Sequence, residues 1–346
     1  MNYTNNKTEK FTTYYSSKVT DYVTSLAWSA SGEKLAVTSA AGEVIIWENQ
    51  QLTNLQTITG KSTDCVAFSA DGEYLAVGGQ DGTVKIWRGN QLITTLENAP
   101  AWVDKLTWHP INNYLAFSLG RYVQVWDADT AEIVVTLNFE NSSILGIDWR
   151  NDGQYLALSG YQGLKVWNSQ NWDDEPYVFA TTTVSLAMGW SPDGKYLASG
   201  NMDRSVTVLE WGNPDPWVMR GFPGKIRQLV WSEVKSATGA PLLATSSVDG
   251  VVVWEKSVDE DLGWEARVLT NHVDIINAIA YIPQSLILTS AGADGWLCVW
   301  NQNDEVAQIL TGVSGGFSTL AWHPQGKFLA AGGEQGELLM WSRTND

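Results

Sequence analysis

A short motif that ends in tryptophan recurs along the whole chain, and its spacing constrains the fold more than any other feature. One copy reads GTVKIW, and seven of the eight copies keep the final tryptophan. The copies end 39 to 46 positions apart, at Trp47, Trp87, Trp126, Trp167, Leu209, Trp254, Trp300 and Trp341. A repeat of this length indicates one structural unit copied in tandem, because a single copy is too small to bury its own apolar face.

Each unit has the pattern of short β-strands. A second aromatic series lies about twenty residues before each motif end, at Trp28, Phe68, Trp108, Trp149, Trp190, Trp231, Tyr281 and Trp322. Apolar residues alternate with period two, so that in VKIW the side chains of Val84 and Ile86 point to one face of a strand. Asp-Gly turns such as SADGEY join the strands. Four strands in about forty residues predict an all-β fold in which each unit is one blade of a propeller.

The chain resembles the WD-repeat β-propeller family over nearly its full length. The likeness lies in units such as VAFSADG at residues 66–72, which leads through Asp81-Gly82 to Trp87. The Trp-Asp pair that gives the family its name occurs once, at Trp126-Asp127. The resemblance implies a buried network of His, Ser, Asp and Trp side chains, for which one complete set is present: His272, Ser290, Asp294 and Trp300. We expect the other blades to depend on packing.

The two ends of the chain carry complementary parts of one blade. Ser16 lies twelve residues before Trp28, as Leu96 lies before Trp108, so residues 11–17 are in phase with a fourth strand. The chain ends five residues after Trp341, before another fourth strand. We therefore predict a closed eight-bladed β-propeller, with four antiparallel strands per blade and the N-terminal strand completing the last blade. Residues 1–10 are expected to be a flexible tail and residues 11–346 a single domain.

Composition narrows the possible partners. Lys plus Arg number 21 and Asp plus Glu number 38, a net charge of −17 that repels nucleic-acid phosphates. The first ten residues do not resemble a signal peptide, and no run approaches the ~20 apolar residues of a membrane helix. Cys65 and Cys298 lie in strands of different repeats. We expect a cytoplasmic monomer with reduced thiols that binds neither nucleic acid nor membranes.

Two faces of the propeller differ in sequence. Residues 169–177, 210–221, 233–241 and 257–265 lengthen connections that emerge on one face, either as a binding surface or as solvated decoration. The opposite face has large apolar residues in its loops, where water favours polar ones. The residues predicted to bind a partner there are Tyr22, Trp102, Tyr161, Val184, Met202, Lys225, Val248 and Ile275. Alternatively, some of these side chains fold over the centre of the ring or pack on neighbouring loops.

The chain contains little that points to catalysis. His109 and His323 lie in His-Pro turns, which favours a turn-stabilising role. No spacing of Cys or His suggests a metal site, and we expect no cofactor. We predict a non-catalytic scaffold that presents Trp102, Tyr22 and Ile275 as anchors to a protein or peptide. The alternative is a propeller enzyme or a small-molecule binder that uses the central channel, since eight-bladed propellers also house quinone-dependent dehydrogenases and haem reductases.

Overall fold

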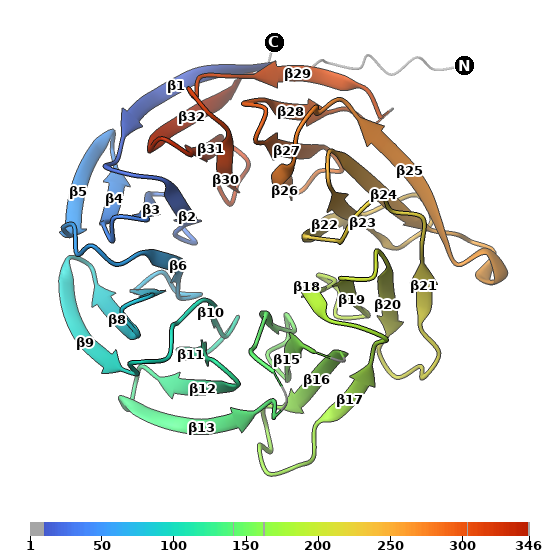
Figure 1. Ribbon diagram of the computed structural model, residues 1–346, viewed down its shortest axis with the longest axis horizontal. Coiled ribbons are helices and arrows are strands. Elements are labelled where there is room, and N and C mark those ends of the chain that lie inside the picture. Colours follow the sequence, from blue (N-terminus) through green and yellow to red (C-terminus); the bar gives the residue numbers. More distant parts are fainter. Residues whose placement is uncertain (1–9, 141, 162, 303, 345–346) are drawn as a thin grey trace.

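The chain forms a closed ring of eight four-stranded antiparallel sheets, as Figure 1 shows. The structure is a computed structural model that describes residues 10–140, 142–161, 163–302 and 304–344. This arrangement confirms the predicted eight-bladed propeller. The predicted tail lies outside the described residues except for Lys10, which is the first residue of β1.

Blades 1 to 4 each consist of four consecutive strands, which follow one another from the centre of the ring outward. Blade 1 contains β2 (Val23–Trp28), β3 (Lys34–Ser39), β4 (Val44–Glu48) and β5 (Gln51–Gln56). Blade 2 contains β6 (Thr63–Phe68), β7 (Tyr74–Gly79), β8 (Thr83–Arg88) and β9 (Gln91–Glu97). Blade 3 contains β10 (Leu106–Trp108), β11 (Tyr114–Leu119), β12 (Tyr122–Asp127) and β13 (Glu132–Asn138). Blade 4 contains β14 (Gly146–Trp149), β15 (Tyr155–Gly160), β16 (Gly163–Asn168) and β17 (Tyr177–Ala180).

Blades 5 to 7 repeat this order, and blade 8 combines both ends of the chain. Blade 5 contains β18 (Ser185–Trp190), β19 (Tyr196–Asn201), β20 (Val206–Glu210) and β21 (Trp217–Met219). Blade 6 contains β22 (Gln228–Lys235), β23 (Pro241–Ser247), β24 (Gly250–Lys256) and β25 (Trp264–Thr270). Blade 7 contains β26 (Ile276–Tyr281), β27 (Leu288–Gly292), β28 (Leu297–Trp300) and β29 (Val306–Leu310). Blade 8 contains β30 (Phe317–Trp322), β31 (Phe328–Gly333), β32 (Glu337–Thr344) and β1 (Lys10–Lys18).

The ring closes because β1 pairs with β32, as the phase of residues 11–17 predicts. The pairing runs from Lys10 opposite Thr344 to Lys18 opposite Glu337. Phe11 is buried, and its ring centroid lies 5.6 Å from that of Trp322 in an edge-on contact. Closure therefore buries apolar surface in addition to pairing the edge of β32, which would otherwise be open to other chains.

The core lies between neighbouring blades and contains the tryptophans that close each repeat motif. In blade 5 the corresponding residue is Leu209, which is also buried. Trp211, two residues later, places its ring centroid 5.1 Å from that of Trp190 and 4.9 Å from that of Tyr155. A neighbouring tryptophan thus supplies an indole in the blade that lacks the usual one.

The lengthened connections all lie at one end of the blades. They join β16 to β17, β20 to β21, β22 to β23 and β24 to β25, so each is a first-to-second or third-to-fourth strand connection. The last of them contains η1 (Glu260–Leu262), a single 3-10 turn and the one helix among the described residues. We call this end face B. Face A is the opposite end, formed by the loops that lead into the innermost strands and by the turns between second and third strands.

Candidate partner-binding face

Main-chain hydrogen bonds hold the loops of face A in place. In blade 5 the Met202 N–H donates to the Val184 carbonyl at 3.0 Å, and in blade 7 the Ala293 N–H donates to the Ile275 carbonyl at 2.8 Å. The same bond joins Ala40 to Tyr22 in blade 1 at 2.9 Å. The residue that leads into the innermost strand is therefore tied to the turn of its own blade. The main chain of these loops is therefore held in a defined conformation.

Seven of the eight residues predicted to bind a partner are exposed on face A. Trp102 is the most exposed of the apolar and aromatic ones, at 54 % of its surface. The others are Tyr22, Tyr161, Met202, Lys225, Val248 and Ile275. Val184 differs, since it is half-buried, and its carbonyl accepts the hydrogen bond from the Met202 N–H. It supports the surface more than it contributes to it.

Five of the eight lie on three consecutive blades. Val184 and Met202 are in blade 5, Lys225 leads into blade 6, and Val248 is in the turn of blade 6. The Ile276 N–H donates to the Val248 carbonyl at 2.9 Å and so joins the turn of blade 6 to the start of blade 7, beside Ile275. We call these five residues the blade 5–7 patch. Tyr22, Trp102 and Tyr161 lie on blades 1, 3 and 4 and are separate from it.

Val248 has an unfavourable backbone conformation. Its φ angle is +56°, in the left-handed region that a β-branched side chain rarely adopts. Such a conformation costs roughly 1–3 kcal/mol and persists only where the surroundings impose it. Ser247 pairs with Gly250, so Val248 is the first residue of a two-residue hairpin loop, a position at which such tight turns require a positive φ.

Two exposed apolar residues of the same face were not predicted. Val273 lies two residues before Ile275 and is 72 % exposed, and Ile58 lies in the loop between blades 1 and 2. Both belong to the loops that lead into innermost strands. Extending the aligned loop positions upstream would have found them, because an exposed valine or isoleucine in a polar loop is the same signal as at Ile275.

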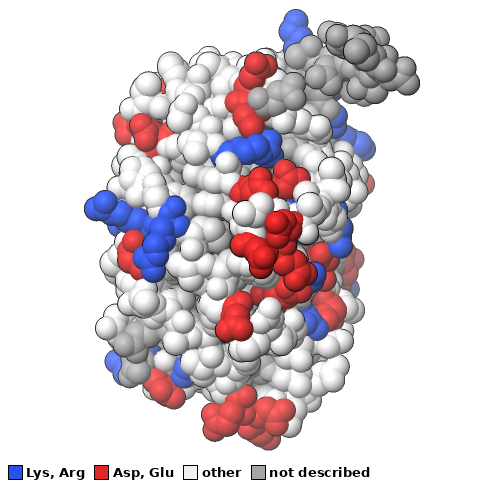
Figure 2. Space-filling model, turned by 90° about the vertical axis from the view of Figure 1, so that its right-hand side faces the viewer, with Lys and Arg blue, Asp and Glu red and all other residues white. Residues whose placement is uncertain are grey.

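The charge of face A is uneven. Figure 2 shows Asp and Glu side chains spread along the rim of the disc, and a group of Lys and Arg side chains at its left edge. On face A, blades 5 and 6 contribute four exposed basic residues: Arg204, Arg220, Lys225 and Arg227. Arg220 approaches Asp203 at 4.0 Å. In blade 1, partial desolvation raises the pKa of Tyr22, and the nearby Glu334 raises it further.

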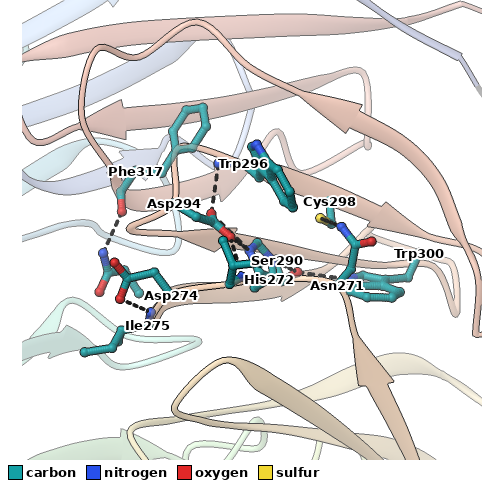
Figure 3. A network of polar contacts seen from close by, with 12 residues as sticks. Asn271, His272, Asp274, Ile275, Ser290, Asp294, Trp296, Cys298, Trp300 and Phe317 are labelled. Atoms are coloured by element: carbon teal, nitrogen blue, oxygen red, sulfur yellow. Dashed lines mark hydrogen bonds and ion pairs between the residues drawn. The ribbon is translucent and has the colours of Figure 1, made fainter.

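A buried polar network supports face A in blade 7 (Figure 3). The Ser290 hydroxyl lies 2.8 Å from His272 Nε2 and accepts a hydrogen bond from Trp300 Nε1 at 2.8 Å. His272 Nδ1 lies 2.9 Å from Asp294 Oδ2, and the same carboxylate accepts from the Val273 and Trp296 N–H groups. The side chains of His272 and Asp294 are almost completely buried. The network therefore connects the loop that contains Val273 to the turn that contains Asp294.

Other blades build different polar networks, so the expectation that they depend on packing alone is wrong. In blade 5 the Asn201 amide donates to Ser205 Oγ and Thr207 Oγ1, and its oxygen accepts from Ser199 at 2.7 Å. In blade 1, Glu43 accepts hydrogen bonds from Thr20 and Ser39. An asparagine in blade 5 and a glutamate in blade 1 thus take the place of the histidine network of blade 7. In each of these networks the buried polar groups have hydrogen-bond partners, as buried polar groups generally require.

The two remaining histidines form hydrogen bonds within turns, and the two cysteines are buried. His109 Nδ1 accepts from the Ile111 and Asn112 N–H groups, and His323 Nδ1 accepts from that of Gln325. These bonds agree with the predicted turn-stabilising role. Cys65 and Cys298 are buried and unpaired, and burial raises the pKa of Cys298 to about 11.

The described residues hold neither a cluster of metal ligands nor a long apolar helix. Residues 10–140, 142–161, 163–302 and 304–344 contain no group of three or more His, Cys, Asp and Glu that could hold a metal ion. Within the same residues, no helix has the length and apolar character needed to cross a membrane.

Comparison with known proteins identifies the family. The family model described as "WD domain, G-beta repeat" matches residues 9–48, 52–88, 177–209, 263–301 and 305–342, which together are more than half of the chain. A comparison with curated proteins gives no match. The segments outside the five matches fall mainly in blades 3, 4 and 6, whose strands pair in the same order as those of the matched blades. The chain belongs to the WD40 repeat family.

Proposed function

We propose that this protein is a non-catalytic scaffold that binds a protein or peptide partner through face A. WD40 propellers commonly serve as protein-interaction scaffolds. The observation that carries the proposal is the blade 5–7 patch, where exposed apolar side chains stand on loops tied by main-chain hydrogen bonds. Trp102 on blade 3 adds a second, aromatic anchor.

The physical basis is preorganisation. Exposed valine, isoleucine, methionine and tryptophan side chains lose contact with water when a partner covers them, which contributes roughly 25 cal/mol per Å² of apolar area. A loop that is already ordered loses little conformational entropy on binding. Val248 is 42 % exposed at the tip of a two-residue hairpin loop, so its side chain is accessible to a partner.

The experiment compares two matched double variants. M202D/I275D places two carboxylates in the blade 5–7 patch, whereas V258D/L262D places two on exposed residues of the connection on face B. A photo-crosslinking residue at position 161 in each variant, expressed in the source cells, reports the bound partner. We expect the M202D/I275D variant to lose the crosslinked species and the V258D/L262D variant to keep it. Equal loss in both, or in neither, would contradict binding at this patch.

Charge and composition support three further parts of the proposal. A net charge of −17 disfavours direct contact with nucleic acid, and two buried reduced thiols suit a cytoplasmic setting. Ring closure within one chain pairs the strand edge that a second copy could otherwise use, so we propose a monomer. Sedimentation of the purified chain tests that state, and a dimer would argue against it.

One observation favours a small-molecule site as a second candidate. An open hollow of about 670 Å³ lies on the innermost strands of blades 4 to 6, with Asp148, Trp190, Trp231 and Glu233 among its lining residues. Desolvation raises the pKa of the Asp148 carboxyl to about 7. A shifted carboxyl beside two indoles in a hollow is typical of ligand sites. Native mass spectrometry and an absorbance spectrum of the purified protein test for a bound molecule.

A further inference from the structure

Eight equivalent positions surround the centre of face A. In five blades a β-bulge falls at the second residue of the innermost strand, and its unpaired residue is Thr24, Asp64, Leu186, Asn277 or Ser318. The repeat places Asp104, Leu145 and Arg227 at the same position in blades 3, 4 and 6, just before the strand begins. A bulge redirects a side chain, and bulges are frequent beside functional sites. We call these eight residues the inner ring.

Three members of the inner ring connect neighbouring blades. Asn277 Nδ2 donates to the Phe317 carbonyl at 2.8 Å, and Ser318 Oγ donates to the Val23 carbonyl at 2.7 Å. Thr24 Oγ1 donates in the same way to the Thr63 carbonyl. Each bond links one blade to the next, so a hydroxyl or amide at this position has a structural role.

Among the residues that the structure describes, the charged residues of the inner ring do not connect neighbouring blades by such hydrogen bonds. Within the described residues the side chains of Asp104 and Arg227 make no hydrogen bond and no ion pair, and that of Asp64 accepts only from Ser62 Oγ. Asp104 and Asp64 are nevertheless close enough to interact. Partial desolvation raises the pKa of the exposed Asp104, Asp64 raises it further, and Lys105 offsets part of this effect. Two carboxylates and a guanidinium therefore occupy positions where small polar residues would have stabilised the ring.

The basic side of the inner ring borders a hollow. Lys225 and Arg227, together with Gln228, line a space of about 260 Å³ that Leu186 and Asn277 bound from the adjacent blades. Lys225 and Arg227 flank the buried Ile226, so both point away from the core. Neither has an ion pair in the described part of the chain, although eight other acidic and basic residue pairs there do.

The two charged regions lie on opposite sides of the ring. Asp64 is in blade 2 and Arg227 precedes β22 of blade 6, four blades away in a ring of eight, and Figure 1 shows β6 and β22 across the centre from each other. Between them on one side, Leu145 and Leu186 are the inner-ring residues of blades 4 and 5. The inner ring is thus negative at Asp64 and Asp104, positive at Arg227 beside Lys225, and apolar at the two leucines between them.

From this arrangement we propose that face A binds a peptide segment of mixed charge along the inner ring, from blades 2 and 3 over blades 4 and 5 to blade 6. A Lys or Arg of the segment faces Asp64 and Asp104, an Asp or Glu faces Lys225 and Arg227, and an apolar residue lies over Leu145 and Leu186. Complementary charges on both sides select such a segment over uniformly acidic or basic ones. The proposal rests on the proposed function and names the chemistry of the partner.

A random dodecapeptide library displayed on phage is the probe. The full chain should enrich peptides that carry both an acidic and a basic residue around an apolar one. D64N/D104N should lose the enrichment of basic residues, and K225Q/R227Q that of acidic residues. A peptide selected on the unmodified chain should bind each variant at least about tenfold more weakly in fluorescence anisotropy, as expected when one side of a complementary pair is removed.

The control keeps the net charge unchanged. D64K/D104K/K225E/R227E exchanges the two signs, so the net charge stays at −17 while the polarity of the inner ring reverses. Because a flexible peptide can bind in either direction, this variant should recover mixed-charge peptides that the two neutralised variants lose. Circular dichroism confirms folding of each variant.

Three outcomes would overturn the proposal. They are enrichment without charge preference, the same peptides on all variants, and no enrichment at all. If peptides without charge preference still depend on Met202 and Ile275, the binding face stands and only the mixed-charge partner is wrong. If no peptide is enriched, the proposed function loses support as well.

Discussion

The Nε2 atom of His109 in blade 3 lies 3.1 Å from the carbonyl oxygen of Gly153, in the first turn of blade 4. The imidazole ring packs against the glycine so closely that a Cβ atom there would overlap its Cε1 and Nε2 atoms. Blades 8 and 1 repeat the relationship, because a Cβ on Gly32 would overlap the His323 ring. Each His-Pro turn therefore stabilises its own blade and also contacts the next one.

We expect Gly153→Ala to destabilise the protein more than Gly72→Ala. Both glycines lie in the same kind of turn, with φ near +72° and +74°, so both changes carry the left-handed cost of about 1–2 kcal/mol. Only Gly153 has a neighbour in the way, since nothing lies within 4 Å of a Cβ at Gly72. The clash should add roughly 1–3 kcal/mol in urea unfolding. Equal effects would show that the His109 contact contributes little.

Opening the ring should be costly. Phe11→Ala removes a buried ring from the contact between β1 and blade 8, and we expect it to lower the free energy of unfolding by about 3–5 kcal/mol. Removing residues 1–18 deletes the whole strand and should cost more. A chain shortened by residues 1–9 keeps β1 and is the control. Calorimetry measures all three, and an unchanged melting temperature without β1 would contradict closure.

Asp148 should make stability depend on pH. Its pKa is about 7 in the folded protein, against about 4 for an unfolded aspartate, so the native state binds the proton more tightly. The stabilisation from the protonated Asp148 carboxyl is fully present below pH 4, and it is lost as the pH rises through 7. Asp148→Asn keeps an oxygen acceptor for the Trp190 N–H, which donates to the carboxylate at 2.8 Å.

We therefore expect Asp148→Asn to be more stable than the unmodified chain at pH 8, by roughly 2 kcal/mol or less because the residue is partly accessible to water. At pH 4 the two should be alike. Urea unfolding from pH 4 to pH 8 measures the difference in the free energy of unfolding between the two proteins. The other carboxylates are the same in both, so their effect cancels in that difference. A difference that does not change with pH would be inconsistent with the raised pKa.

The network of blade 7 should tolerate little change. Asp294→Ala removes the acceptor of the buried His272 ring and of two main-chain N–H groups, and we expect a loss of about 3–5 kcal/mol. Asp81 has the same place in the turn of blade 2 but is partly exposed beside Lys85. Asp81→Ala should therefore cost about 1 kcal/mol or less. Similar losses at both positions would argue against a special role for the blade 7 network.

The propeller itself followed from spacing and strand period. Units of about forty residues with alternating apolar positions leave few other arrangements, and the phase of residues 11–17 predicted the pairing of β1 with β32. The loops of face A were predicted for the same reason, because the repeat aligns Tyr22, Lys225 and Ile275. The local sequence pattern is sufficient to predict the blades, the closing strand and the loops of face A. Each of them depends on residues within one repeat or on the position of a segment relative to the repeat.

What the sequence alone determined about this protein is thus the number of blades, their strand order and the site of closure. The tertiary structure decided which residues meet across blades, including His109 with Gly153 and Asp104 with Asp64, and how far a loop residue such as Val184 is buried. Those contacts join residues about forty positions apart or depend on how deeply one loop lies beneath another. They are set by the packing of neighbouring sheets into a closed ring, which no single repeat encodes.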